Sequence, residues 1–440
     1  MFLPLLNLVV PWFLVGLVSS SSRQQKQQGD DSSSSSVTDR YLKPFSLELH
    51  NFPQTGRGVR TVVDRAPGDI LLQVPVADTV VATDEESSFV SSTSDTPSTT
   101  TTTTLSNEQK LAMKIASLRE EHHPYISSDM IPKVQHFSVW SLPSELWDLL
   151  CLPKCYRESF QATRTMVTEF CRQQSFSDNN KNNNGDDDDI DTIEWAFSMT
   201  RSRSFAVPEL TQENAVDKDP VPLALIPGLD LFNHGFDAGT VLQLKDNTWT
   251  LTSSKSYNAG DQIFLSYGDD KDNWKLLLTY GFSIPNNPNT LVFWTWEELL
   301  QAAGQVRPKM FPERVRQSLF RHPQLTIYTT PTEDRATFSF DAKTQTPRES
   351  LQNGLTLLSS LATQLGYPQD DELPQEVMEQ LVQNRLIEIQ NCRGKLSSSS
   401  KSVPSEWKTF WGSVQLALEE EEAYLSNSSL SEPATTGEEL

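Results

Sequence analysis

The chain has 440 residues, with 36 Lys and Arg against 58 Asp and Glu, and its formal net charge is −22. This acidity argues against a nucleic-acid-binding protein, because such a protein needs clustered Lys and Arg to displace counterions from phosphates. It suits a basic protein partner instead. Two acidic runs, Asp186–Asp189 and Glu419–Glu422, carry much of the charge. Solvated acidic tracts therefore explain the charge as well as a basic partner does.

The chain begins with an apolar run, Phe2–Val18, that ends in small residues. The run predicts a signal or targeting leader over residues 1–20, since it is short and poorly flanked for a membrane span. If the leader is removed, no stable membrane insertion is expected. The protein would then enter the secretory route, or a plastid that is reached through that route. If it is retained, it forms one N-terminal anchor. The Ser- and Gln-rich residues 21–40 predict a disordered spacer.

The first folded region is expected over residues 41–290. Val59–Val63 and Asp69–Val76 are rich in aliphatic and β-branched residues and follow Gly-containing turns, so they predict a short β-meander. A helical insert is predicted over about residues 105–190, because Leu105–Glu121 has apolar residues at helical spacing after Ser106. Further helices are expected at residues 146–150 and 156–173, and a polar loop at 175–191.

After the insert, Thr192–Ser202 predicts a helix. Short apolar runs separated by Gly and Asn turns then predict four strands, at residues 223–226, 240–244, 248–253 and 262–266. Helical patterns dominate later, clearest over residues 350–365, 375–392 and 404–425. We therefore expect an all-helical domain over residues 291–426, followed by a tail over 427–440.

The four cysteines are Cys151, Cys155, Cys171 and Cys392, and they lack paired CxxC spacing and nearby histidines. A structural zinc site is therefore not expected, and no metal is assigned. One disulfide among the first three cysteines is an open alternative to buried free thiols, which are the commoner fate.

Four motifs follow one another in the second β-rich stretch. They are RSRSF at residues 201–205, LIPGLDLFNH at 225–234, SYG at 266–268 and YGF at 280–282, and a Gly56-Arg57-Gly58 turn precedes them. Each alone is ordinary: Gly-x-Gly is common in hairpins, and Tyr-Gly-Phe is common in cores. In this order they resemble the SET-domain protein methyltransferases of the Rubisco large-subunit lysine methyltransferase group.

The resemblance implies an α+β fold, with a SET domain split by the helical insert and followed by an all-α substrate-binding domain. It implies S-adenosylmethionine as the cofactor and a protein-lysine N-methyltransferase acting on a non-histone protein. The catalytic residue would be Tyr267, whose hydroxyl faces the transferring methyl group. The cofactor would be held by Gly56, Arg57, Gly58, Arg203, Asn233, His234 and Phe282, and the substrate by Asp230 and Tyr280.

Alternatives remain for residues and for function. Arg203 could form a surface ion pair, His234 could end a turn, and Asp230 could cap a helix. A histidine-methylating branch of the same fold carries Trp where this chain has Leu229, which favours lysine. The other alternative is a non-catalytic SET-like interaction module, against which the hydroxyl of Tyr267 argues.

Overall fold

The computed structural model describes residues 37–82, 105–128, 131, 142, 144–147, 149–175, 186–210, 221–321, 338–399, 403–404 and 407–426. The predicted leader, the Ser/Thr-rich tract at 87–104, the tail and most of the predicted spacer lie outside these residues. The helix α1 (Val37–Tyr41) begins inside the predicted spacer, four residues before the expected start of the fold. Its last residue, Tyr41, is buried in the core.

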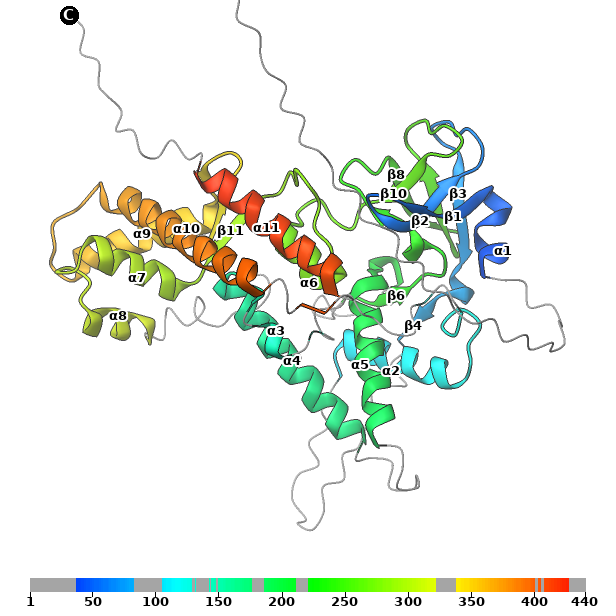
Figure 1. The fold of residues 1–440 in the computed structure, drawn as a ribbon, viewed down its shortest axis with the longest axis horizontal. Coiled ribbons are helices and arrows are strands. Elements are labelled where there is room, and N and C mark those ends of the chain that lie inside the picture. The colour runs from blue at the N-terminus through cyan, green and yellow to red at the C-terminus, as the bar shows by residue number, and fades with distance from the viewer. Residues whose placement is uncertain are drawn as a thin grey trace, which may run out of the picture. The chain divides into compact units, whose positions relative to one another are not determined.

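A four-stranded sheet brings distant motifs together (Figure 1). Its order is β1 (Leu47–Phe52), β2 (Gly56–Thr61), β10 (Gln262–Leu265) and β7 (Asn233–His234). Strand β2 is antiparallel to β1 and β10, whereas β7 runs parallel to β10 with Asn233 opposite Phe264. Strand pairing thus links the glycine turn to the Asn-His pair.

Two three-stranded sheets complete this β region and confirm the predicted strands. One has the order β3 (Ile70–Pro75), β9 (Thr248–Ser253), β8 (Thr240–Lys245). The other joins β4 (Val80–Val81), β6 (Leu223–Leu225) and β5 (Ser204–Ala206). Every second residue of β9 is buried, as expected for a strand with one face on the core. Single-turn 3-10 helices lie at Lys43–Phe45, Val76–Asp78, Pro208–Leu210 and Leu229–Leu231.

The insert contains α2 (Asn107–Glu120), α3 (Ser144–Trp147) and α4 (Lys154–Ser175), and α5 (Asp186–Arg203) includes the helix predicted after it over residues 192–202. A capping box between Ser106 and Gln109 starts α2. The polar loop predicted at 175–191 is wrong in its last residues, because α5 already begins at Asp186.

The C-terminal region follows α6 (Asn273–Tyr280) and is mostly helical. Its helices are α7 (Trp296–Val306), α8 (Glu313–Phe320), α9 (Glu349–Gln364), α10 (Leu373–Ser399) and α11 (Lys408–Ser426), seen with β11 on one side of Figure 1. It is not all-helical, because β11 (Leu291–Trp294), β12 (Phe338–Asp341) and β13 (Thr346–Pro347) form a sheet. A four-residue apolar run such as Leu291–Trp294 does not distinguish strand from helix.

A disulfide joins the insert to this region, since Cys151 is bonded to Cys392. The alternative of a disulfide among the first three cysteines is therefore wrong. Cys155 is a buried free thiol, and Cys171 is also buried. Sequence spacing could not reveal a pair 241 residues apart. Among the described residues, no helix is long and apolar enough to span a membrane, and no group of three His, Cys, Asp or Glu could hold a metal ion.

Candidate active site

The glycine turn and Asn233 fit closely against each other. The side-chain amide of Asn233 donates hydrogen bonds to the carbonyl oxygens of Thr55 (3.3 Å) and Arg57 (3.2 Å). A Cβ atom on Gly58 would lie 2.6 Å from the amide nitrogens of both Asn233 and Gln262. Only glycine leaves room for these side chains at this position of the turn.

His234 lies beneath Tyr267. The backbone N–H of Tyr267 donates to Nδ1 of His234 at 3.1 Å, and the two rings stack with centroids 5.2 Å apart. Burial lowers the pKa of His234, which is 4% exposed. The imidazole is therefore neutral, with its proton on Nε2 because Nδ1 accepts. That buried Nε2 has no hydrogen-bond partner among the described residues.

The hydroxyl of Tyr267 donates to the backbone oxygen of Phe232 at 2.7 Å. Burial raises the pKa of Tyr267, so the phenol keeps its proton at neutral pH. The ring of Tyr280 lies 4.6 Å from that of Tyr267, and Phe282 lies 6.1 Å from Tyr280. Burial also raises the pKa of Tyr280 to about 12. The two later motifs thus form one aromatic wall.

A buried ion pair borders the same wall. Arg203 donates through Nη1 to Asp230 Oδ2 at 2.9 Å, and the hydroxyl of Tyr125 donates to Asp230 Oδ1. Burial alone would lower the pKa of Arg203, but the adjacent Asp230 outweighs it and the net pKa is raised. The Asp230 side chain has no exposed area. Arg203 Nε is buried without a partner among the described residues.

Tyr125 was missed by the sequence reasoning. It follows α2 in the insert, outside all four motifs, and its hydroxyl also accepts a hydrogen bond from the backbone N–H of Gly228 at 3.2 Å. No pattern in the sequence marks this residue, because its role depends on a contact with a carboxylate 105 positions away.

A cavity of about 370 Å³ lies against the ion pair and the aromatic wall. Four of the predicted site residues line it, namely Arg203, Asp230, Tyr267 and Tyr280. The other six lie outside its lining, namely Gly56, Arg57, Gly58, Asn233, His234 and Phe282. The cavity also contacts Phe205 and Ser202 of the first motif, and Glu108, Arg201 and Lys271 provide further charges.

Arg57 interacts electrostatically with Arg203, which lines this cavity. Burial lowers the pKa of Arg57, and the positive charge of Arg203 lowers it further. The glycine turn and the ion pair are therefore neighbours, although they belong to opposite ends of the β region. His234 and Tyr267 form the other connection between the two groups of predicted residues.

Helix α6, which carries Tyr280 at its C-terminal end, is anchored at its start. Asp272 caps it by accepting from the backbone N–H groups of Trp274 (2.7 Å) and Lys275 (3.0 Å). The hydroxyl of Tyr156 in α4 donates to the same carboxylate at 2.6 Å, and the Trp274 indole donates to Glu421 in α11 at 2.8 Å. Burial raises the pKa of Asp272 to about 6.

No protein-family model matches the chain. It is 23% identical over 281 residues to "SET domain-containing protein 4" of Artemia parthenogenetica, covering 60% of this chain and 64% of that protein. It is 33% identical over 108 residues to the chloroplastic ribulose-1,5 bisphosphate carboxylase/oxygenase large subunit N-methyltransferase of Pisum sativum, covering 22% and 20%. An actin-histidine N-methyltransferase of Drosophila melanogaster is 36% identical over 104 residues, covering 22% and 18%.

The chain thus spans just under two thirds of the first of these proteins and about a fifth of the other two. The chain is thus similar in sequence to SET-domain protein methyltransferases, among them the large-subunit methyltransferase of Rubisco.

Proposed function

We propose that this chain is an S-adenosylmethionine-dependent protein-lysine N-methyltransferase that acts on a non-histone protein. The observation that carries the proposal is the cavity beside Tyr267. Its walls include the aromatic rings of Phe205, Tyr267 and Tyr280. Such walls suit the aliphatic stem of a lysine, whose amine would reach the buried end.

The chemistry requires a neutral amine. A lysine amine has an ordinary pKa of about 10.4, and transfer into a desolvated aromatic site lowers it. Arg201 and Arg203 in the lining are paired with Glu108 and Asp230, and Lys271 adds a further positive charge that disfavours an ammonium group. Tyr267 is a protonated phenol, so it orients the reacting groups and does not act as a strong base.

S-adenosylmethionine would supply the methyl group as a sulfonium and would leave as a thioether. The residues that would hold it are the glycine turn at 56–58, Asn233 and His234, with Phe282 as a wall. Unsatisfied polar atoms support this fit, because Gln262 Nε2 and His234 Nε2 are both buried without partners among the described residues. Positioning the donor and the amine in one line can contribute about 7–11 kcal/mol to lowering the barrier.

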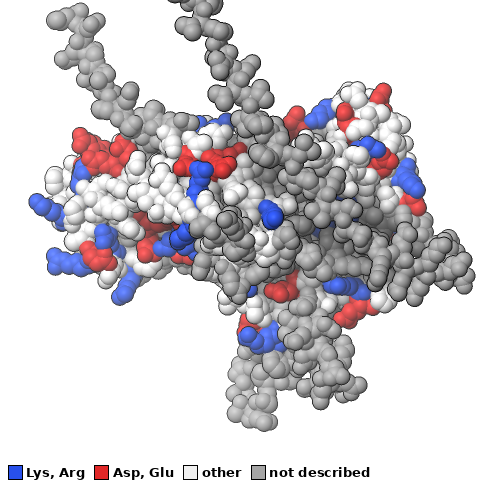
Figure 2. Space-filling model, in the orientation of Figure 1, with Lys and Arg blue, Asp and Glu red and all other residues white. Residues whose placement is uncertain are grey.

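The partner is a protein, and a nucleic acid is disfavoured by the net charge of −22. On the face that Figure 2 shows, acidic and basic side chains are interspersed among the described residues, without a broad patch of one sign. The Cys151–Cys392 disulfide supports a secretory route or a plastid reached through it, because disulfides persist in oxidising compartments.

Histidine is the second candidate acceptor, and the similarity to an actin-histidine methyltransferase supports it. Leu229 argues for lysine, since the histidine branch carries tryptophan there. The non-catalytic alternative is weakened because Tyr267 remains inside an aromatic cavity next to the ion pair.

The test is label transfer from methyl-labelled S-adenosylmethionine to proteins in a lysate of the source organism, with cofactor binding measured by calorimetry. We expect the wild-type protein to bind the cofactor and to label a small number of lysate proteins. Binding without any label transfer would support the interaction module instead, and absence of both would contradict the proposal.

A further inference from the structure

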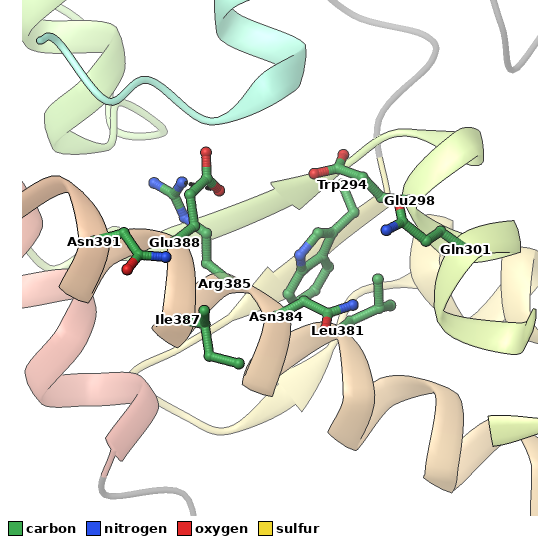
Figure 3. Close-up of a pocket in the computed structure, with 9 residues that line it drawn as sticks. All are labelled: Trp294, Glu298, Gln301, Leu381, Asn384, Arg385, Ile387, Glu388 and Asn391. Atoms are coloured by element: carbon green, nitrogen blue, oxygen red, sulfur yellow. Dashed lines mark hydrogen bonds and ion pairs between the residues drawn. The ribbon is translucent and has the colours of Figure 1, made fainter. Parts of the chain in front are cut away.

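A second cavity lies between α7 and α10, apart from the predicted site residues. Its volume is about 340 Å³. In Figure 3, Glu298 and Gln301 reach it from α7, and Asn384, Arg385 and Glu388 reach it from α10. None of its lining residues belongs to the four motifs or to the aromatic cavity. The proposed methyl-transfer chemistry leaves this cavity unexplained.

Two carboxylates face the cavity. Glu298 closes the capping box of α7, and both of its hydrogen bonds, from the backbone N–H and the hydroxyl of Thr295, fall on Oε2. Burial raises the pKa of Glu298, and the negative charge of Glu388 raises it further. Like charges around one cavity destabilise each other, and a bound cation would relieve that repulsion.

The guanidinium of Arg385, which lines the cavity, is already paired with carboxylates. Arg385 donates through Nε and Nη2 to both oxygens of Glu421 at 2.7 and 3.0 Å, and the two side chains are each 3% exposed. Its Nη1 donates to Glu388 Oε2 at 2.7 Å. Arg157 lies 3.4 Å from the other oxygen of Glu388, as a half-exposed rim contact. With Glu421 offsetting Arg385 and Arg157 offsetting Glu388, the negative charge that the lining retains is that of Glu298.

Neutral polar groups accompany these charges. Trp294 is 2% exposed, lines the cavity, and turns its indole nitrogen toward it in Figure 3. The carboxamide of Gln301 adds an oxygen acceptor, whereas Asn384 Oδ1 already accepts from Gln380 at 3.0 Å. A guanidinium has five N–H donors in a planar fork, which suits several acceptors better than an ammonium does.

We propose that this cavity binds an arginine side chain of the protein substrate, at a distance along the chain from the lysine that is methylated. The inference rests on the proposed function, because it takes the occupant to belong to the methyl acceptor. The C-terminal region would then recognise one basic residue of the substrate.

The first test measures binding of N-acetyl-arginine amide by calorimetry, without cofactor. N-acetyl-citrulline amide is the neutral probe of the same shape. Glu298→Gln removes the charge and keeps the capping box, which accepts Gln at this position. We expect the arginine probe to bind, the citrulline probe to bind at least about tenfold more weakly, and Glu298→Gln to lose about tenfold for the arginine probe.

Glu297→Gln is the matched control, since it makes the same charge change one residue away, on a half-exposed side chain paired with Lys154 outside the cavity. It should bind the arginine probe like wild type. Absence of arginine binding, equal binding of the two probes, or equal losses in Glu297→Gln and Glu298→Gln would overturn the site.

The second test repeats the lysate labelling with both variants. We expect Glu298→Gln to raise the KM for the labelled protein with little change in kcat, and Glu297→Gln to match wild type. If the arginine probe binds but labelling is unaffected by Glu298→Gln, the cavity takes a free small cation and the substrate assignment is wrong. If no variant labels anything while probe binding holds, the methyltransferase proposal has failed and the binding site has not.

Discussion

Two buried arginine–carboxylate pairs, one in the β region and one in the C-terminal helices, differ in how completely they are satisfied. Arg203 and Asp230 border the aromatic cavity, and Arg203 Nε lacks a partner among the described residues. Arg385 and Glu421 form two hydrogen bonds, and Glu421 also accepts from the Trp274 indole. The incomplete pair is suited to ligand binding, whereas the complete pair stabilises the packing of helices.

The largest effect that this comparison predicts is that of Tyr267→Phe, in the β region. We expect methyl transfer to fall by about 10²–10⁴, the range for one positioned proton-handling group. Stability should fall by only about 1–3 kcal/mol, because the oxygen of Phe232 loses its donor. Single-turnover labelling and chemical denaturation measure the two effects. Wild-type transfer rates in the variant would remove Tyr267 from the reaction.

Glu421→Ala should show the opposite profile. Removing it leaves Arg385 and the Trp274 indole without a buried partner, so the free energy of unfolding should fall by about 3–5 kcal/mol. Glu422→Ala is the control in the same helix, since Glu422 pairs with the half-exposed Arg393. That change should cost less than about 1 kcal/mol. Similar losses in the two variants, measured by denaturant titration, would contradict the assignment.

The contribution of Asp272 to the free energy of unfolding should depend on pH. Its pKa is about 6 in the folded protein, above the ordinary value of about 3.9, so the folded state binds the proton more tightly. This contribution to stability is present below about pH 4 and is lost as the pH rises through 6, amounting to about 2–3 kcal/mol.

Asp272→Asn keeps a good helix cap and removes the titration. Between pH 4 and pH 7, the wild type should therefore lose about 2–3 kcal/mol relative to the variant. Denaturant titrations at several pH values measure this difference. Parallel stability curves for the two proteins would show that Asp272 does not titrate in this range.

The smallest expected effect separates cofactor binding from folding. Asn233→Ala should weaken S-adenosylmethionine binding about tenfold, because the amide that spans the glycine turn is lost. Asn353→Ala, at an exposed position of α9, is the control. Calorimetry that shows the same affinity for both variants would place Asn233 outside the cofactor site.

Sequence reasoning succeeded where local chemistry decides the structure. The strands around Gly56–Gly58 and Asn233–His234 follow from turn residues and β-branched runs, and the Ser106 cap follows from its capping box. The order of motifs also identified four residues that line one cavity, including Tyr267 and Tyr280.

Sequence reasoning failed where contacts between distant segments decide the structure. The Cys151–Cys392 disulfide, the contact of Tyr125 with Asp230 and the Arg385–Glu421 pair each join segments that share no local pattern. The three-stranded sheet that begins at Leu291–Trp294 was missed for another reason, because a short buried apolar run fits either a strand or a helix.

The most direct test of the central claim is the identity of the methylated residue. Proteins labelled by the wild-type chain from methyl-labelled S-adenosylmethionine would be hydrolysed to amino acids and separated by chromatography. We expect the label in Nε-methyllysine, and a strong reduction of that signal with Tyr267→Phe. Label recovered as methylhistidine, or the same methyllysine signal with the variant, would contradict the proposal that Tyr267 serves lysine methylation.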